Sequence, residues 1–243
     1  MRHEAISSTQ INIEYLLAFV AGFAEAVCIL GLFGSFTTFI TGTIVLAITD
    51  FASNNPNYIT KSFILFSFIL LQVFWIYLIR KLHLQKTNTA TIMLFIETGL
   101  MLLFFLIGSY IGKLSSPYAA NTFIISFFAI ATMSLHSTIF FRVLNKRAPT
   151  HFMTGNSTNL FAAAFEMLDN FRADKNISDL PYPQASAKAK YYFGVIFGFI
   201  IGVVLGTIGY KIWGFPSLAL PVVMTLFTAL STQQHGAPPT ANS

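Results

Sequence analysis

Charged residues are scarce in this chain. Only 9% of its 243 residues are Asp, Glu, Lys or Arg, whereas 55% are hydrophobic and Phe alone occurs 27 times. An ordinary soluble domain carries about 25% charged residues. A single core in a chain of this length cannot bury so much apolar surface, so lipid must cover part of it. The composition therefore predicts an all-α polytopic membrane protein.

Cysteine and enzyme signatures are also missing. Cys28 is the only cysteine, which excludes an internal disulfide and leaves the redox compartment open. The sequence has no H-E-x-x-H, G-x-S-x-G or P-loop motif, and no Cys/His cluster with metal-ligand spacing. We therefore expect no enzyme, no metal and no other cofactor. Ser137 beside His136 leaves an intramembrane hydrolase as a third hypothesis, although neighbours in a helix point in different directions.

The net charge of +5 does not make nucleic acid an expected partner, because basic residues of membrane proteins mostly mark cytoplasmic loops. The first apolar run also lacks a small-residue cleavage site, so we expect a retained helix rather than a signal peptide. Six runs are long enough to span a membrane at about 20 residues each. They are residues 14–33, 60–80, 91–112, 121–143, 189–210 and 215–232.

Two shorter segments share a motif. Residues 37–48, TTFITGTIVLAI, and 150–161, THFMTGNSTNLF, align at Phe-x-Thr-Gly, with Gly42 and Gly155 lying 113 residues apart. A repeat of this length indicates a duplicated membrane unit. We expect a cytoplasmic leader (1–13), two membrane repeats (14–112 and 121–232) and a disordered tail (233–243).

The Lys and Arg residues favour re-entrant Thr-Gly segments. With re-entrance and a cytoplasmic N-terminus, eleven of the 14 basic residues lie inside and only Lys61, Lys113 and Lys211 lie outside. Complete crossing would divide them evenly, seven to seven. Three crossings per half is an odd number, so re-entrance predicts two inverted repeats with six transmembrane helices and two re-entrant or broken helices. The alternative is eight spans in parallel repeats.

The same segments carry a family resemblance. AGFAEAVCILGLFGSFTTFITGTIVLA (21–47) and SLHSTIFFRVLNKRAPTHFMTGNSTNLFAA (134–163) are similar to the YoaK-like bacterial membrane family, a domain of unknown function. Glu25-Ala26 stands where that family usually has Asp-Ala, and His136-Ser137 stands where it has Gln-Asn. The positions Arg142, Thr154, Gly155, Thr158 and Asn159 match its second motif. The resemblance implies a multi-pass protein of the bacterial inner membrane and names no substrate.

The Thr-Gly segments are the predicted substrate-binding site. A helix that begins inside the membrane presents unpaired amides and the positive end of its dipole, which suits an anion. Two such starts meeting at the midplane would form one site, whereas the alternative is a simple helix-packing contact. The candidate binding residues are Thr41, Gly42, Thr43, Thr154, Gly155, Asn156 and Asn159.

Three ionisable residues fall inside predicted spans. Such residues usually face the protein interior, because a charge in the hydrocarbon is unfavourable. Glu25 is expected to lie near the amides of Thr41–Thr43 and to couple transport to a proton or cation, with a purely structural hydrogen bond as the alternative. His136 is a second coupling candidate that could equally be structural. Glu97, which lies nearer the interface and is able to snorkel, is expected to be structural.

Four glycines in the predicted fifth span recur at every fourth residue. Gly194, Gly198, Gly202 and Gly206 share one helix face, which predicts close helix packing. We expect a secondary transporter that moves a small polar or anionic solute across the lipid bilayer. The alternatives are a channel of the same fold and a structural membrane protein that transports nothing. A homo-oligomer is possible.

Overall fold

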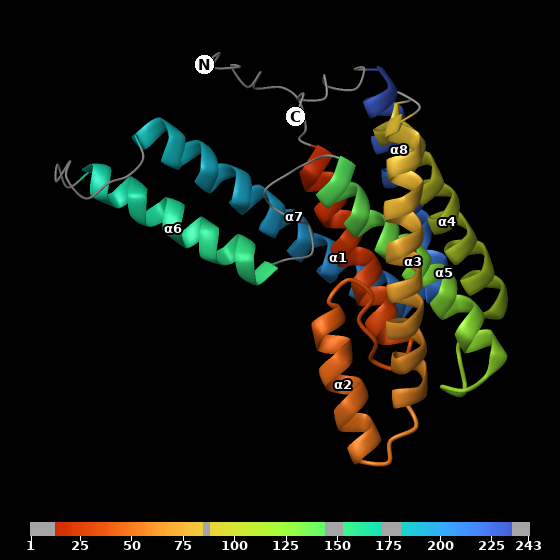
Figure 1. Cartoon of the computed structure of the whole chain (residues 1–243). Coiled ribbons are helices and arrows are strands. Elements are labelled where there is room, and N and C mark those ends of the chain that lie inside the picture. Colours follow the sequence, from red (N-terminus) through yellow and green to blue (C-terminus); the bar gives the residue numbers. More distant parts are fainter. Residues whose placement is uncertain (1–12, 85–87, 144–152, 172–180, 235–243) are drawn as a thin grey trace.

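The computed structural model describes residues 13–84, 88–143, 153–171 and 181–234 (Figure 1). Every regular element in these ranges is helical. The elements are α1 (Ile13–Gly31), α2 (Ile40–Ala52), α3 (Tyr58–Leu84), α4 (Thr89–Ile111), α5 (Ala120–Thr138), the π-helix η1 (Ile139–Val143), α6 (Met153–Phe171), α7 (Tyr182–Trp213), the 3₁₀ turn η2 (Phe215–Leu218) and α8 (Ala219–Gln234). The predicted leader and tail fall mostly outside these ranges.

Six segments in the described part are long and apolar enough to cross a membrane. They are Ile13–Gly31, Tyr58–His83, Thr89–Ile111, Ala120–Val143, Tyr182–Trp213 and Phe215–Gln233. Each contains most of one run predicted from the sequence, so the all-α multi-pass fold is confirmed. The two Thr-Gly segments form the remaining α2 and α6. With 13 residues α2 is short for a span, and α6 carries Glu166, Asp169 and several Asn residues that keep its hydropathy low.

The two halves of the chain interlock rather than lie side by side. The first helix of each half packs on the third helix of the other, α1 on α7 and α5 on α3. The fourth helices, α4 and α8, pack on each other, while α2 and α6 pack on the third helix of their own half. Figure 1 shows α2 and α6 projecting from the central bundle in different directions. Every main contact of one half therefore has a counterpart in the other.

Burial follows the same pairing. The spans containing α1 and α5 are 72% and 78% buried, those of α4 and α8 are both 44% buried, and those of α3 and α7 are 22% and 28% buried. The first helix of each half is thus central and the third helix is peripheral. Because α3 and α7 expose long runs of large apolar side chains, their outer faces are the surfaces that lipid would cover.

Glycine brings α1 and α7 into contact at the level of the backbone. A Cβ on Gly202 would lie 2.1 Å from the Phe19 carbonyl oxygen, and a Cβ on Gly206 would lie 2.6 Å from that of Phe23. From the other side, a Cβ on Gly22 would lie 2.2 Å from the Phe199 carbonyl oxygen. Such distances exclude any side chain at these positions. The predicted packing role of the glycines on α7 is confirmed, since small residues allow two helix backbones to approach closely.

Replacing Gly202 with Val should therefore separate α1 from α7 and destabilise the protein. Overpacking of a tight contact costs about 1–3 kcal/mol, so the midpoint of thermal unfolding in detergent should fall by several degrees. Gly99→Ala is the matched control, because a Cβ at Gly99 meets nothing within 4 Å. Equal unfolding midpoints for the two variants would refute the backbone-level contact.

Candidate functional site

The connection from α1 to α2 turns sharply within eight residues. Phe33 and Gly34 have positive φ angles of 54° and 73°, and the Gly34 amide donates to the Ile29 carbonyl at 3.0 Å. This left-handed pair closes the last turn of α1. The chain then runs back along α1, so that α2 begins beside the interior of α1 rather than beyond its end.

Glu25 receives four hydrogen bonds from this returning segment. Its Oε2 accepts from the Thr37 amide at 3.0 Å, the Thr37 hydroxyl at 2.8 Å and the Thr38 amide at 3.0 Å. Its Oε1 accepts from the Phe39 amide at 3.3 Å. Successive backbone amides that converge on one group form an anion-binding nest. The Glu25 side chain is only 4% exposed, so its carboxyl group fills this nest inside the protein.

Glu25 also satisfies the amides that lead into α2. Phe39, the N-cap residue of α2, makes no side-chain capping bond. The amides just before the helix are instead satisfied by a carboxyl group from another helix, where the dipole favours negative charge. The sequence predicted that Glu25 would meet the start of this helix, and it does. Its partners, however, are residues 37–39 rather than the expected Thr41–Thr43 amides.

Gly42 and Thr43 of the first motif shape the turn. The Thr43 hydroxyl donates to the Phe36 carbonyl at 2.7 Å and accepts from the Phe36 amide at 3.1 Å, which pins the turn to α2. A Cβ on Gly42 would lie 2.4 Å from the Phe39 ring, so glycine makes room for that ring over the helix. Thr41 is exposed. Gly42 and Thr43 thus stabilise the turn that carries the nest and do not line the nest themselves.

The second motif lies apart from the first. Thr154 and Asn159 are exposed, Gly155 is half-buried and Asn156 is buried. Since α2 packs only on α3 and α6 packs only on α7, the described residues of the two helices do not touch. The expectation of one site made by both helix starts is therefore wrong for this conformation. Each Thr-Gly helix instead packs along the third helix of its own half.

His136 and Glu97 form a second buried polar cluster. The His136 Nδ1 lies 2.7 Å from the Glu97 Oε1, and the two side chains are 1% and 0% exposed. Glu97 does not snorkel, because the imidazole of His136 on α5 contacts one of its carboxyl oxygens inside the bundle. Its other oxygen, Oε2, has no hydrogen-bond partner among the described residues. Glu25 bonds to Thr37–Phe39 whereas His136 bonds to Glu97, so the two coupling candidates have different partners in the described residues.

Lys61 was missed as a site residue by sequence reasoning, which used it only to count charges. Its ammonium group lies 2.7 Å from the Asp50 carboxylate and 2.8 Å from the Phe33 carbonyl oxygen, and Lys61 is 3% exposed. It therefore ties the end of α1, the end of α2 and the start of α3 together. The available signal was a pair of opposite charges on either side of the Asn54-Asn55-Pro56 turn.

The support that Thr43 gives the nest can be tested with a neighbouring control. Thr43→Val keeps the shape of the side chain but leaves the amide and carbonyl of Phe36 without their partner, a loss of about 1–3 kcal/mol for buried groups. Thr41→Val should be neutral, since Thr41 is exposed. Thermal unfolding in detergent should separate the two variants by several degrees. Indistinguishable midpoints would show that the turn does not depend on Thr43.

Comparisons with known proteins identify a family without an assigned activity. No curated protein and no solved structure matches this chain. A family model described as "Protein of unknown function (DUF1275)" matches residues 13–231, which covers both halves and both Thr-Gly motifs. The expected membership of a family of unknown function is confirmed, and the YoaK-like label stays a prediction. The chain belongs to the DUF1275 family.

Proposed function

We propose that this protein is a secondary transporter of the bacterial inner membrane that moves a small anion together with a proton. The observation that carries the proposal is the nest around Glu25. Three backbone amides and one hydroxyl converge on a single carboxyl group at the start of a helix in an apolar interior. Donors arranged in this way bind anions in general. The chain's own carboxylate occupies the position that a substrate anion would take.

The charge of Glu25 then decides whether the nest is free. As a carboxylate, Glu25 accepts all four hydrogen bonds and excludes another anion from the same donors. Once protonated, one of its oxygens becomes an O–H donor while the other can still accept, and the attraction of a negative charge to the positive end of α2 is lost. The Thr37–Phe39 amides can then bind a solute anion. The proton on Glu25 and a monovalent anion in the nest would thus enter as a neutral pair.

The Glu97–His136 cluster supports a role for protons. Buried ionisable groups inside membrane spans commonly belong to proton or ion pathways. Here a carboxyl group and an imidazole share one short contact on α4 and α5, while the second carboxyl oxygen lacks a partner in the described ranges. In this proposal His136 and Glu97 exchange protons with the aqueous side, and Glu25 carries the proton that accompanies the anion.

Re-entrance of α2 is supported by Lys61. Because its ammonium group contacts both the Phe33 carbonyl and Asp50, the end of α1 and the end of α2 lie at the same end of α3. The chain therefore leaves and re-enters on one side of the membrane in our proposal. The exchanged contacts of the two halves suggest the same course for α6 and hence inverted repeats. A channel on this fold and a purely structural role are the alternatives.

Re-entrance can be tested by labelling single cysteines with a membrane-impermeant maleimide in intact cells. In a Cys28→Ala background, Ser53→Cys between α2 and α3 should react from the outside under either topology. Gln184→Cys, in the exposed first turn of α7, should react only after the cells are opened. Complete crossing of both Thr-Gly helices would place Gln184 outside. Labelling of Gln184→Cys in intact cells would therefore rule out re-entrance.

Proton coupling can be tested in proteoliposomes that contain a pH-reporting dye. Inward gradients of sulfate, phosphate or lactate are the probes, and the transported anion should acidify the interior when it enters with a proton. Glu25→Gln keeps the size of the side chain but cannot titrate. We expect this variant to carry labelled anion without acidification and without pH dependence.

Three outcomes would contradict these expectations. An unchanged pH profile in Glu25→Gln would return Glu25 to a structural capping role. Flux that does not saturate and shows no counterflow would indicate a channel on the same fold. If the wild-type protein moves none of a broad panel of small anions, the transport proposal fails and a structural role remains.

A further inference from the structure

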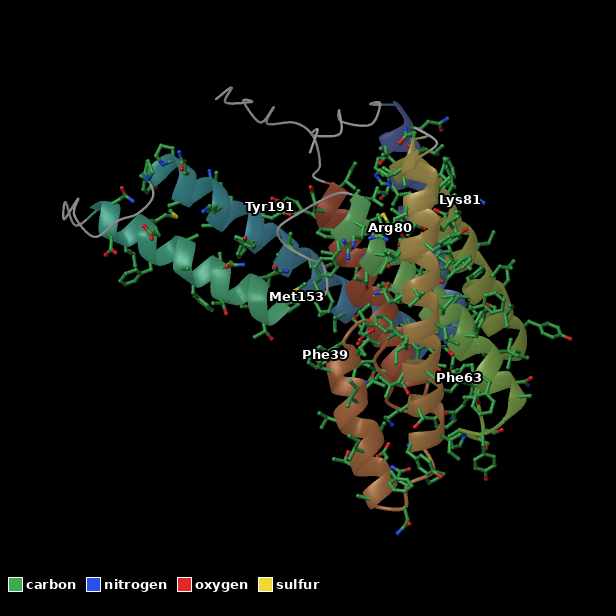
Figure 2. The ribbon with its side chains drawn as sticks, in the orientation of Figure 1. Phe39, Phe63, Arg80, Lys81, Met153 and Tyr191 are labelled. Carbon is green, nitrogen blue, oxygen red and sulfur yellow. The ribbon has the colours of Figure 1, made fainter. Side chains whose placement is uncertain are left out.

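A cavity lies at the end of α3, away from the Glu25 nest. Its volume is about 470 Å³, and its lining residues are Ile76, Ile79, Arg80 and His83 from α3 together with Arg142 from η1. Figure 2 marks Arg80 near the end of α3 that lies farthest from α2. The cavity is thus formed where the most exposed span meets the π-helix that ends α5.

Two guanidinium groups share this cavity without a counter-charge. Neither Arg80 nor Arg142 forms an ion pair in the described part of the chain, and the lining contains no acidic residue. Each guanidinium stays charged at any physiological pH and presents a planar fork of donors that fits phosphate. Two such groups at one cavity repel each other unless an anion lies between them. The cavity is therefore suited to an anionic ligand.

The irregular end of α5 helps to place Arg142. The five residues Ile139–Val143 form a π-helix, a feature that often occurs at functional sites. Ile139 and Phe140 of this turn are buried, whereas Phe141 and Arg142 are exposed. The turn thus anchors itself in the bundle through its first two side chains and presents the guanidinium of Arg142 towards the α3 surface.

The surroundings of the two arginines are apolar. Ile76 and Ile79 line the cavity itself. The outer face of α3 continues below it as a stripe of exposed large apolar side chains, namely Ile69, Leu70, Val73, Phe74 and Tyr77. A small soluble anion would make no contacts with this apolar stripe. A ligand with a charged head and long hydrocarbon chains would cover both surfaces at once.

The depth of the cavity agrees with a lipid headgroup. From Tyr58, the first residue of α3, to Ile79 the helix rises roughly 30 Å at 1.5 Å per residue. This equals the thickness of the hydrocarbon core of a bilayer, about 30 Å. With Tyr58 at one boundary of the core, Arg80 and His83 would lie just beyond the other boundary, at the level of the phosphates. Basic pockets between spans at this level bind anionic headgroups.

We propose that Arg80 and Arg142 bind the phosphate of an anionic phospholipid, whose acyl chains lie along the exposed face of α3. The lipid would join α3, from the first half, to the end of α5, from the second half. Phosphatidylglycerol and cardiolipin have suitable headgroups, whereas phosphatidylcholine carries a cationic choline that the two arginines disfavour. The site does not depend on the transport proposal.

The experiment uses the purified, delipidated full chain in detergent. Thermal unfolding is measured after addition of phosphatidylglycerol, phosphatidylcholine or inorganic phosphate, and lipid retention is counted by native mass spectrometry. Phosphatidylglycerol should raise the unfolding midpoint and remain bound. Phosphatidylcholine and inorganic phosphate should do neither at equal concentration. Stabilisation by inorganic phosphate alone would assign the site to a soluble anion and overturn the lipid proposal.

Variants locate the effect at the cavity. Arg80→Gln with Arg142→Gln should lower the affinity for phosphatidylglycerol at least tenfold. Lys81→Ala is the matched control, because Lys81 is exposed in the same turn, does not line the cavity and lies on a different side of α3 from Arg80 (Figure 2). If the double variant does not fold, each single variant is measured instead. Retained binding in the arginine variants, or equal loss in Lys81→Ala, would refute the site.

Discussion

The structure depends on one constraint, which is that backbone amides in an apolar interior must find partners. The segment before α2 returns along α1 with three amides that no helix satisfies, and the carboxyl group of Glu25 accepts from all of them. An unpaired amide in such surroundings is costly, and irregular backbone at this depth is tolerated only where protein or water satisfies it. Three features hold the amides in place around that carboxyl group. They are the turn at Phe33, the contacts of Lys61 with Phe33 and Asp50, and the hydrogen bonds of Thr43 to Phe36.

The hydrophobic pattern predicted the spans well because a run of about 20 consecutive apolar residues is rarely found outside a transmembrane helix. The internal repeat and the approach of Glu25 to the first helix start also followed from spacing along the chain. Contacts between distant helices did not. The pair Glu97–His136 depends on how α4 and α5 pack, and partners on different helices of a bundle leave no periodic signal in a single sequence.

The separation of the two Thr-Gly starts was missed for a related reason. The internal repeat suggested that equivalent segments would meet. In this fold, however, the two halves exchange packing partners. The first helix of each half seats against the third helix of the other, with backbone contact between α1 and α7. The equivalent segments α2 and α6 are thereby carried to different sides. A central pair, α1 and α5, remains between them and holds the buried groups Glu25 and His136.

The central claim is that Glu25 holds the place of an anion and gives it up by taking a proton. Infrared difference spectroscopy on the reconstituted protein measures this directly, because carboxylate and carboxylic acid groups absorb at different frequencies. When the transported anion is added, the account predicts loss of a carboxylate band and gain of a protonated carboxyl band, which persist in Glu97→Gln and vanish in Glu25→Gln. Anion binding with no change in the protonation of Glu25 would contradict it.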